Sequence, residues 1–159
     1  MHFSRDSRGF VAAVATAATL ATACSGAGGT IENAGPVTTA RIATAAGMVL
    51  LQGEILAKYQ SVDGVNGPLG LPIGTEQPVP NGGRRTIFEN GAIYWSPQTG
   101  AHIVRDAIRG TWEDEYGGAG GPLGYPTTDE KSVPGGWQSQ FQHGAITYTG
   151  DQPHVEIHT

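Results

Sequence analysis

The residues of this chain best suited to chemistry are aromatic side chains with hydrogen-bonding residues nearby. Tyr94, Tyr125 and Trp137 could each present a ring to a ligand. Aromatic faces stack on the C–H faces of sugars while polar groups hold the hydroxyls, so a sugar site needs both kinds of side chain. The pattern therefore predicts a carbohydrate-binding surface. The further candidates for it are Trp95, Arg84, Arg85 and His102.

Catalytic and metal-binding chemistry have weaker support. The chain has no Gly-x-Ser-x-Gly nucleophile motif, and its one cysteine lies near the N-terminus. The adjacent carboxylates Asp129 and Glu130 are typical of solvated charge rather than of an acid–base pair. His154, Glu156 and His158 alternate along one expected strand and could ligate a metal, but an exposed polar strand end has the same pattern. We predict no catalytic residue, no metal site and no cofactor.

An internal repeat organises the elements that must position these residues. Gly67-Pro68-Leu69-Gly70-Leu71-Pro72 recurs 54 residues later as Gly121-Pro122-Leu123-Gly124-Tyr125-Pro126, and Gly91-Ala92-Ile93 recurs 53 residues later as Gly144-Ala145-Ile146. Such a period means that one supersecondary unit is used twice.

Comparison of the two copies separates the aromatic residues. Tyr94, Tyr125 and Trp137 have no aromatic counterpart in the other copy, so we expect them at a surface. Trp95 corresponds to Tyr148 and shares a strand face with Ile93, so it belongs either to the core or to the site.

Each copy has the pattern of a short helix, a Gly/Pro loop and a small antiparallel meander. Apolar residues spaced by four predict the helices, with Asp106 as a possible N-cap of the second. Leu69 and Leu123 are expected in the core. The sequence thus predicts an α+β, mainly β fold of two tandem repeats of about 54 residues. The helix positions are Leu51, Ile55, Tyr59, Ile108, Trp112 and Tyr116, and the strands are 85–89, 92–96, 101–105, 138–142, 145–148 and 154–158.

The N-terminal segment has the pattern of an export signal. Arg5 and Arg8 precede an uncharged apolar stretch that is too short for a membrane span. Cys24 follows a sequence similar to a lipobox, which predicts lipidation, whereas Ala21-Thr22-Ala23 also suits ordinary signal peptidase. The expected organisation is a signal peptide at 1–23, a flexible Gly/Ala/Thr tether at 24–46 and repeats at 47–107 and 108–159.

The charge of the chain argues against nucleic acid as a partner. The formal net charge is −5, charged residues make up 14 %, and Lys and Arg form no cluster. Nucleic-acid binding requires such clusters. Contact with a membrane is expected only through a lipid anchor.

The second half of the chain resembles the LGFP repeat. The resemblance rests on Leu-Gly-x-Pro followed by Phe88-x-x-Gly91-Ala92-Ile93-Tyr94-Trp95-Ser96-Pro97, and it covers about 51–158 in two copies. It implies a role in the envelope of mycolic-acid-containing actinobacteria, where such repeats are thought to bind cell-wall polysaccharide, arabinogalactan being the favoured candidate. It also implies an exported protein in the cell envelope, lipid-anchored to the outer face of the cytoplasmic membrane or secreted and wall-associated.

The sequence leaves three functions open. The first is a non-catalytic envelope module that binds wall polysaccharide and anchors or organises the envelope. The second is an interaction module that docks another exported protein or a second copy of itself, because two repeats leave the ends of an array open. An envelope hydrolase is the weakest alternative. With two copies the array must be an open pair, a self-paired dimer or dependent on a partner.

Overall fold

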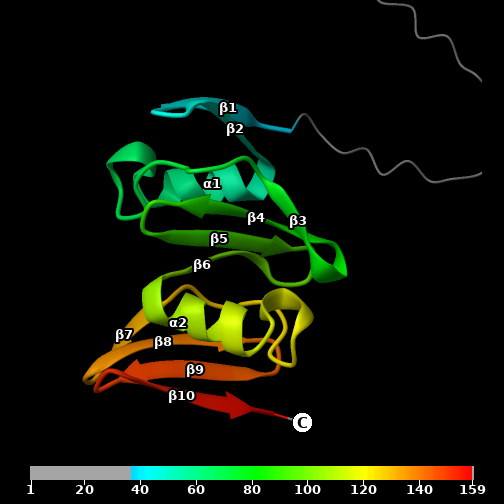
Figure 1. Cartoon of the computed structure of the whole chain (residues 1–159). Coiled ribbons are helices and arrows are strands. Elements are labelled where there is room, and N and C mark those ends of the chain that lie inside the picture. The colour runs from blue at the N-terminus through cyan, green and yellow to red at the C-terminus, as the bar shows by residue number, and fades with distance from the viewer. Residues whose placement is uncertain (1–36, 159) are drawn as a thin grey trace, which may run out of the picture. The chain divides into compact units, whose positions relative to one another are not determined.

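Ten strands form three antiparallel sheets in residues 37–158, the part of the chain that the computed structural model describes (Figure 1). The predicted signal peptide, Cys24 and the tether up to residue 36 lie outside the described residues. The described residues 37–158 belong to one compact unit. The predicted α+β, mainly β fold is confirmed.

Each copy of the repeat contains one four-stranded meander. Phe88 pairs with Gly91 across a two-residue turn of Glu89 and Asn90, so the turn lies one residue before the predicted Asn90-Gly91 pair. The three longer strands of each sheet lie where they were predicted. The short edge strands β3 and β7 were not predicted, because three residues are too few for an alternating pattern. The first sheet comprises β3 (Gln77–Val79), β4 (Gly83–Phe88), β5 (Gly91–Ser96) and β6 (Gly100–Val104), and the second comprises β7 (Lys131–Val133), β8 (Gly136–Phe141), β9 (Gly144–Thr149) and β10 (Gln152–Ile157).

One helix precedes each sheet. α1 (Gly53–Ser61) precedes the first, and α2 (Asp106–Gly110) runs into a π-helical turn, η3 (Thr111–Glu115), before the second. The prediction that Asp106 caps a helix is wrong, because Asp106 is already the first helical residue and no side chain caps α2. Short 3-10 turns are η1 (Gly64–Asn66), η2 (Pro80–Gly82) and η4 (Gly118–Gly120). The predicted helix-face residues Ile55, Tyr59, Ile108 and Trp112 are buried.

The end of the predicted tether is instead a β-hairpin. β1 (Thr39–Thr44) pairs with β2 (Gly47–Gln52), so the expectation of a flexible segment up to residue 46 is wrong for its last residues. Ile42 pairs with Val49, and Ala40 pairs with Leu51, on the face that packs against α1. The small side chains of β1 hid this alternation in the sequence. Leu51 is buried as predicted, but it lies in β2 rather than in a helix.

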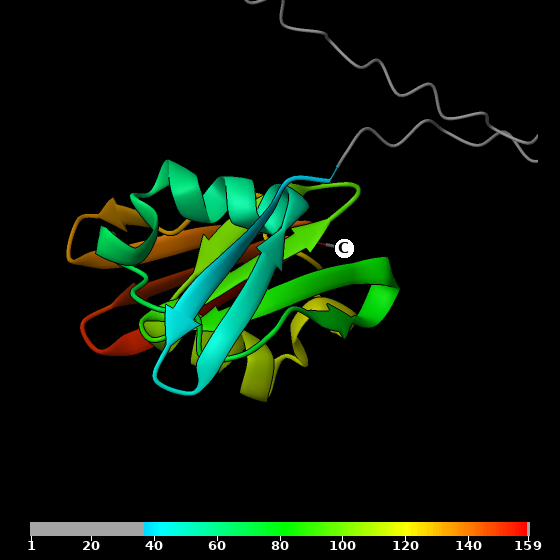
Figure 2. The same ribbon diagram turned by 90° about the horizontal axis from the view of Figure 1, so that it is seen from above.

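The elements stack in alternating layers (Figure 1): hairpin, α1, first sheet, α2 with η3, and second sheet. One apolar cluster joins the hairpin and α1 to one face of the first sheet, and it includes Leu51, Tyr59 and Ile93. A second cluster joins the opposite face of that sheet to α2, η3 and the second sheet. Figure 2, viewed from the hairpin end, shows the hairpin lying over the remaining layers.

The outward face of the second sheet is polar where the equivalent face of the first is apolar. In the first sheet this face packs against α2, whereas no described helix follows the second sheet. His154 and Glu156 on this face are exposed. The counterparts of Ile87, Tyr94 and Val104 are Gln140, Thr147 and Glu156.

The Gly-Pro-Leu-Gly loops lock each helix onto its sheet. Leu69 and Leu123 are fully buried, as predicted. Tyr59 Oη donates to the carbonyl of Gly70 over 2.8 Å, and Trp112 Nε1 donates to the carbonyl of Gly124 over 3.2 Å. Both of these glycines have positive φ, +71° and +69°, a conformation that favours glycine. The loop sequence therefore repeats because each copy needs the same backbone path.

Candidate functional site

Tyr94 lies in the core, so the expectation of an open surface position is wrong for it. Its side chain is 2 % exposed, and its ring meets Trp112 edge-on at 4.6 Å between centroids. The Tyr94 hydroxyl donates to Glu113 and accepts a hydrogen bond from Arg85 Nη1 over 3.0 Å. Burial and the hydrogen bond to Glu113 raise the pKa of Tyr94 well above its ordinary value. Tyr94 and Arg85 thus hold the first sheet against η3.

Tyr125 is also buried, at 1 % exposure, and the prediction of a surface role is wrong for it too. Its hydroxyl donates to the carbonyl of Pro80 over 2.5 Å and therefore joins the second copy to the first. The hydroxyl also lies over Gly83, where the Cβ of any larger residue would stand 2.2 Å from it. Tyr125 belongs to the interface between the copies.

His102 and Asp129 form another link between the copies. His102 Nε2 lies 2.8 Å from the carbonyl oxygen of Thr99, and Nδ1 lies 3.6 Å from the Asp129 carboxylate. The side chain of His102 is 18 % exposed. These contacts give the histidine a structural position rather than an open face for a ligand.

Arg84 and Trp95, two of the predicted ligand-binding residues, lie against each other. The guanidinium of Arg84 lies 4.6 Å from the centroid of the Trp95 ring, and its Nη1 lies 3.0 Å from Glu76 Oε1. A cation over an aromatic face occupies the surface on which a sugar would stack. Trp95 is therefore half-buried beneath an ion pair.

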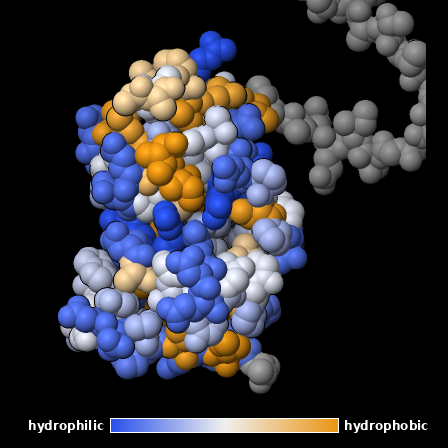
Figure 3. All heavy atoms as spheres, viewed as in Figure 1, coloured by the Kyte–Doolittle hydropathy of each residue, from blue (hydrophilic) through white to orange (hydrophobic). Residues whose placement is uncertain are grey.

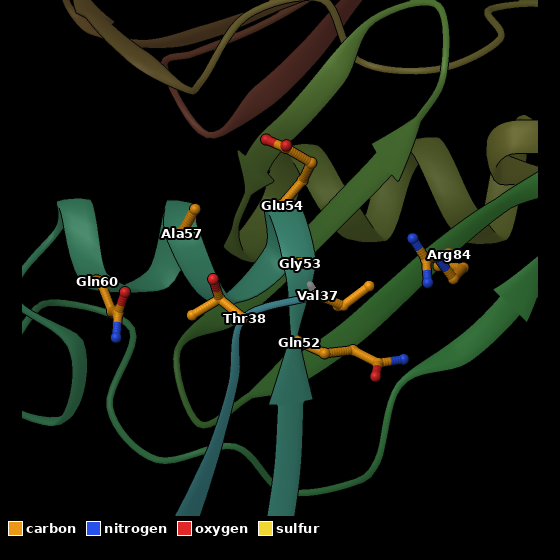
Figure 4. Close-up of a pocket in the computed structure, with 8 residues that line it drawn as sticks. All are labelled: Val37, Thr38, Gln52, Gly53, Glu54, Ala57, Gln60 and Arg84. Atoms are coloured by element: carbon orange, nitrogen blue, oxygen red, sulfur yellow. The ribbon is translucent and has the colours of Figure 1, made fainter. Parts of the chain in front are cut away.

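A pocket of about 450 Å³ opens between the start of β1, the N-terminal turns of α1 and Arg84 (Figure 4). Its polar side chains could hold hydroxyl groups, but no aromatic ring lines it. It is lined by Val37, Thr38, Gln52, Gly53, Glu54, Ala57, Gln60 and Arg84.

Trp137 is the predicted ligand-binding residue that lies at the surface. It is 46 % exposed and pairs directly with Tyr148 across β8 and β9, so the two rings share a face. Both line a pocket of about 310 Å³ with Gly135, Gly136, Gly150 and Asp151. Gly135 and Gly150 have open space where a Cβ would stand, and both have positive φ. These glycine turns leave Trp137 open to solvent beside the half-buried Tyr148 and the Asp151 carboxylate.

The fold and this geometry agree with the comparison to known families. The LGFP repeat family matches residues 69–121 and 123–158. This chain belongs to the LGFP repeat family. LGFP repeats are a non-catalytic repeat family, and the match indicates a cell-envelope repeat module. Comparison with curated proteins gives no match.

The LGFP matches frame the repeat differently from the predicted units. The first match runs from the Leu69 loop through the first sheet and α2, and the second runs from the Leu123 loop through the second sheet. A helix in this stack contacts the sheet on either side, so the unit can begin at either element. α1 and the hairpin precede the first LGFP match.

The two LGFP copies offer different surfaces at the same place in the sheet. Arg84 pairs with Trp95 in the first copy, and Trp137 pairs with Tyr148 in the second. An ion-paired arginine covers the Trp95 ring in one copy, whereas an exposed tryptophan stands opposite a half-buried tyrosine in the other. The internal comparison in the sequence identified Trp137 but left Tyr148 between core and surface and gave no sign of Asp151.

The described part of this LGFP chain has neither a metal-binding cluster nor a membrane-spanning helix. In residues 37–158, no group of three His, Cys, Asp or Glu side chains could hold a metal ion. No helix in the same range is long and apolar enough to cross a lipid bilayer.

Proposed function

We propose that this chain is a non-catalytic envelope module that binds cell-wall polysaccharide through Trp137 and Tyr148. The observation that supports it is the exposed ring of Trp137 beside the half-buried Tyr148 on one face of the second sheet. A sugar ring can stack on an indole or phenol face, and Asp151 can accept hydrogen bonds from its hydroxyls. A neutral polysaccharide of the arabinogalactan type suits this site, because the charged residue that lines the pocket, Asp151, is an acceptor of hydrogen bonds from hydroxyl groups.

Binding is unequal between the copies in this proposal. The second copy supplies the stacking surface, while the ion pair of Arg84 and Glu76 covers Trp95 in the first. The pocket at the start of α1 adds hydrogen-bonding groups but no ring. The module therefore engages the polysaccharide mainly through the second sheet.

The placement of the module in the cell follows from the N-terminal sequence. We propose export, cleavage before Cys24 and lipidation of that cysteine, which retains the protein at the outer face of the cytoplasmic membrane. Secretion with wall association is the alternative. Mass spectrometry of the protein from its native envelope distinguishes an acylated Cys24 from an unmodified N-terminus.

Co-sedimentation with insoluble cell wall tests the binding. The chain Ser25–Thr159 contains the whole compact unit and is mixed with wall before and after removal of arabinogalactan. We expect pelleting that is lost with the polysaccharide. Trp137→Ala should weaken it about tenfold or more, which is typical of losing an aromatic anchor. Ile73→Ala is the matched control, because Ile73 is an exposed apolar side chain (62 %) outside the site.

Two results would contradict this function. Pelleting that survives removal of the polysaccharide would point to another wall component. A folded chain that pellets with neither preparation would favour the protein-docking alternative.

A further inference from the structure

The hairpin β1–β2 has one face that no described element covers. Val49 and Leu51 point to α1, whereas Met48 and Leu50 on the opposite face are 63 % and 43 % exposed. Arg41 pairs directly with Leu50 and is exposed on the same face. Figure 3 shows hydrophobic residues gathered at this end of the unit. We call Arg41, Met48 and Leu50 the hairpin face.

The hairpin itself carries one positive charge and no negative charge. Residues 37–52 include Arg41 and no Asp or Glu, although the chain has a net charge of −5. Exposed Met and Leu side chains suit the boundary between lipid headgroups and acyl chains. An arginine between them can reach the phosphates of anionic lipids.

The hairpin is also the first described element after the lipidation site. Twelve residues separate Cys24 from Val37, and this number of residues spans at most about 43 Å when fully extended. The second sheet, with Trp137, lies at the other end of the layered stack. An anchored Cys24 thus keeps the hairpin close to the bilayer.

We propose that the hairpin face rests on the surface of an anionic membrane and that the second sheet then points towards the wall. Only the placement near the bilayer relies on the proposed lipidation of Cys24. The contact is an interfacial one, with Met48 and Leu50 in the headgroup region and Arg41 at the phosphates.

Met48 provides a direct test, because the chain has two methionines and Met1 is lost with the signal peptide. Cys24–Thr159 is coupled through its only thiol to a maleimide lipid in vesicles of phosphatidylcholine and phosphatidylglycerol. The rate of Met48 oxidation by dilute hydrogen peroxide is followed by mass spectrometry. We expect Met48 on vesicles to oxidise about tenfold more slowly than in the same chain coupled to a soluble maleimide. This factor corresponds to an orientation with Met48 in water that is populated only about one tenth of the time.

Variants separate this contact from wall binding. Arg41→Glu should remove the protection on anionic vesicles, whereas Ile73→Glu, at an exposed apolar position elsewhere, should keep it. Both variants should still sediment with cell wall if Trp137 is the polysaccharide site. An unchanged oxidation rate on vesicles overturns the proposal whatever the wall assay shows. Protection that appears only when envelope protein is added also overturns it and assigns the face to a protein.

Discussion

Lys58 Nζ lies 2.5 Å from the carboxylate of Asp129, and this contact joins α1 of the first copy to the loop before β7 of the second. The same carboxylate accepts the backbone N–H of Ile103 over 2.9 Å. One side chain of the second copy thus holds both a helix and the edge strand of the first. Asp129→Asn should therefore lower the urea midpoint of unfolding. The amide of asparagine is uncharged, so its interactions with the ammonium of Lys58 and the N–H of Ile103 are weaker. Asp151→Asn, at an exposed turn, is the control.

The contribution of Asp129 to stability should depend on pH. Burial opposes ionisation of Asp129, but the nearby His102 and the hydrogen bonds from Lys58 and Ile103 outweigh it and lower its pKa to about 2 from the ordinary 3.8. The unfolded chain then binds the proton more readily, so this stabilisation is full above about pH 4 and is lost as the pH falls towards 2.

Urea unfolding at neutral pH and at pH values between 2 and 4 measures this acid dependence. Burial raises the pKa of Glu130, which acts in the opposite sense, so the comparison must be made between wild type and Asp129→Asn. The wild type should lose more stability on acidification than the variant. Equal acid slopes would show that Asp129 does not hold the copies together.

Gly83→Ala should destabilise the chain although the φ of Gly83 is −93°, an ordinary value. A Cβ there would stand 2.2 Å from Tyr125 Oη and 2.4 Å from the carbonyl oxygen of Trp95. Relieving this overlap requires movement at the interface of the copies, with a loss of about 1–3 kcal/mol. Gly74→Ala is the control, since nothing lies within 4 Å of its Cβ position and its φ is not positive. Thermal unfolding of the two variants compares them, and similar midpoints would contradict the packing argument.

Tyr125→Phe should lower stability without changing wall binding. The variant leaves the carbonyl of Pro80 without its 2.5 Å hydrogen bond while keeping the ring, which corresponds to a loss of about 1–3 kcal/mol. Wall co-sedimentation run beside urea unfolding checks both halves of the expectation. Weaker wall binding by a folded Tyr125→Phe variant would instead indicate that the Tyr125 hydroxyl takes part in polysaccharide binding.

The outward face of the second sheet can be converted into a copy of the first. The triple variant Gln140→Ile, Thr147→Tyr and Glu156→Val gives the second sheet the residues that the first sheet has at the equivalent positions. These residues are Ile87, Tyr94 and Val104. An apolar sheet face of this kind needs a cover, so the triple variant should self-associate at micromolar concentration. Analytical ultracentrifugation measures the change. The same assay on Gln98→Val, in an exposed turn, should show no change from wild type.

The repeat and its strands could be predicted because each copy provides its own pattern. Leu69 and Leu123 are buried as the repeated loop required, and the first hairpin turn lies one residue before the predicted Asn90-Gly91 pair. The hairpin could not be predicted in this way. Its inner face consists of Ala40 and Ile42 on one strand, and a strand with so few large side chains has the composition of a linker.

The candidate site was only partly predictable for a different reason. Tyr94 and Tyr125 were expected at a surface because the other copy has Thr147 and Leu71 instead. The structure places both tyrosines between the copies, where each makes a contact that has no equivalent at the end of the array. A position that differs between tandem copies can therefore mark the joint between them as well as a ligand site.

The polar residues at the two ends of the stack limit where a further repeat can be added. A new copy added after β10 would meet Gln140, Thr147 and Glu156, and one added before β1 would meet Arg41. A copy inserted between the first sheet and α2 would meet the apolar faces that already fit each other. Gene duplication within the array can thus extend the protein in one step, whereas terminal addition requires compensating changes at several positions first.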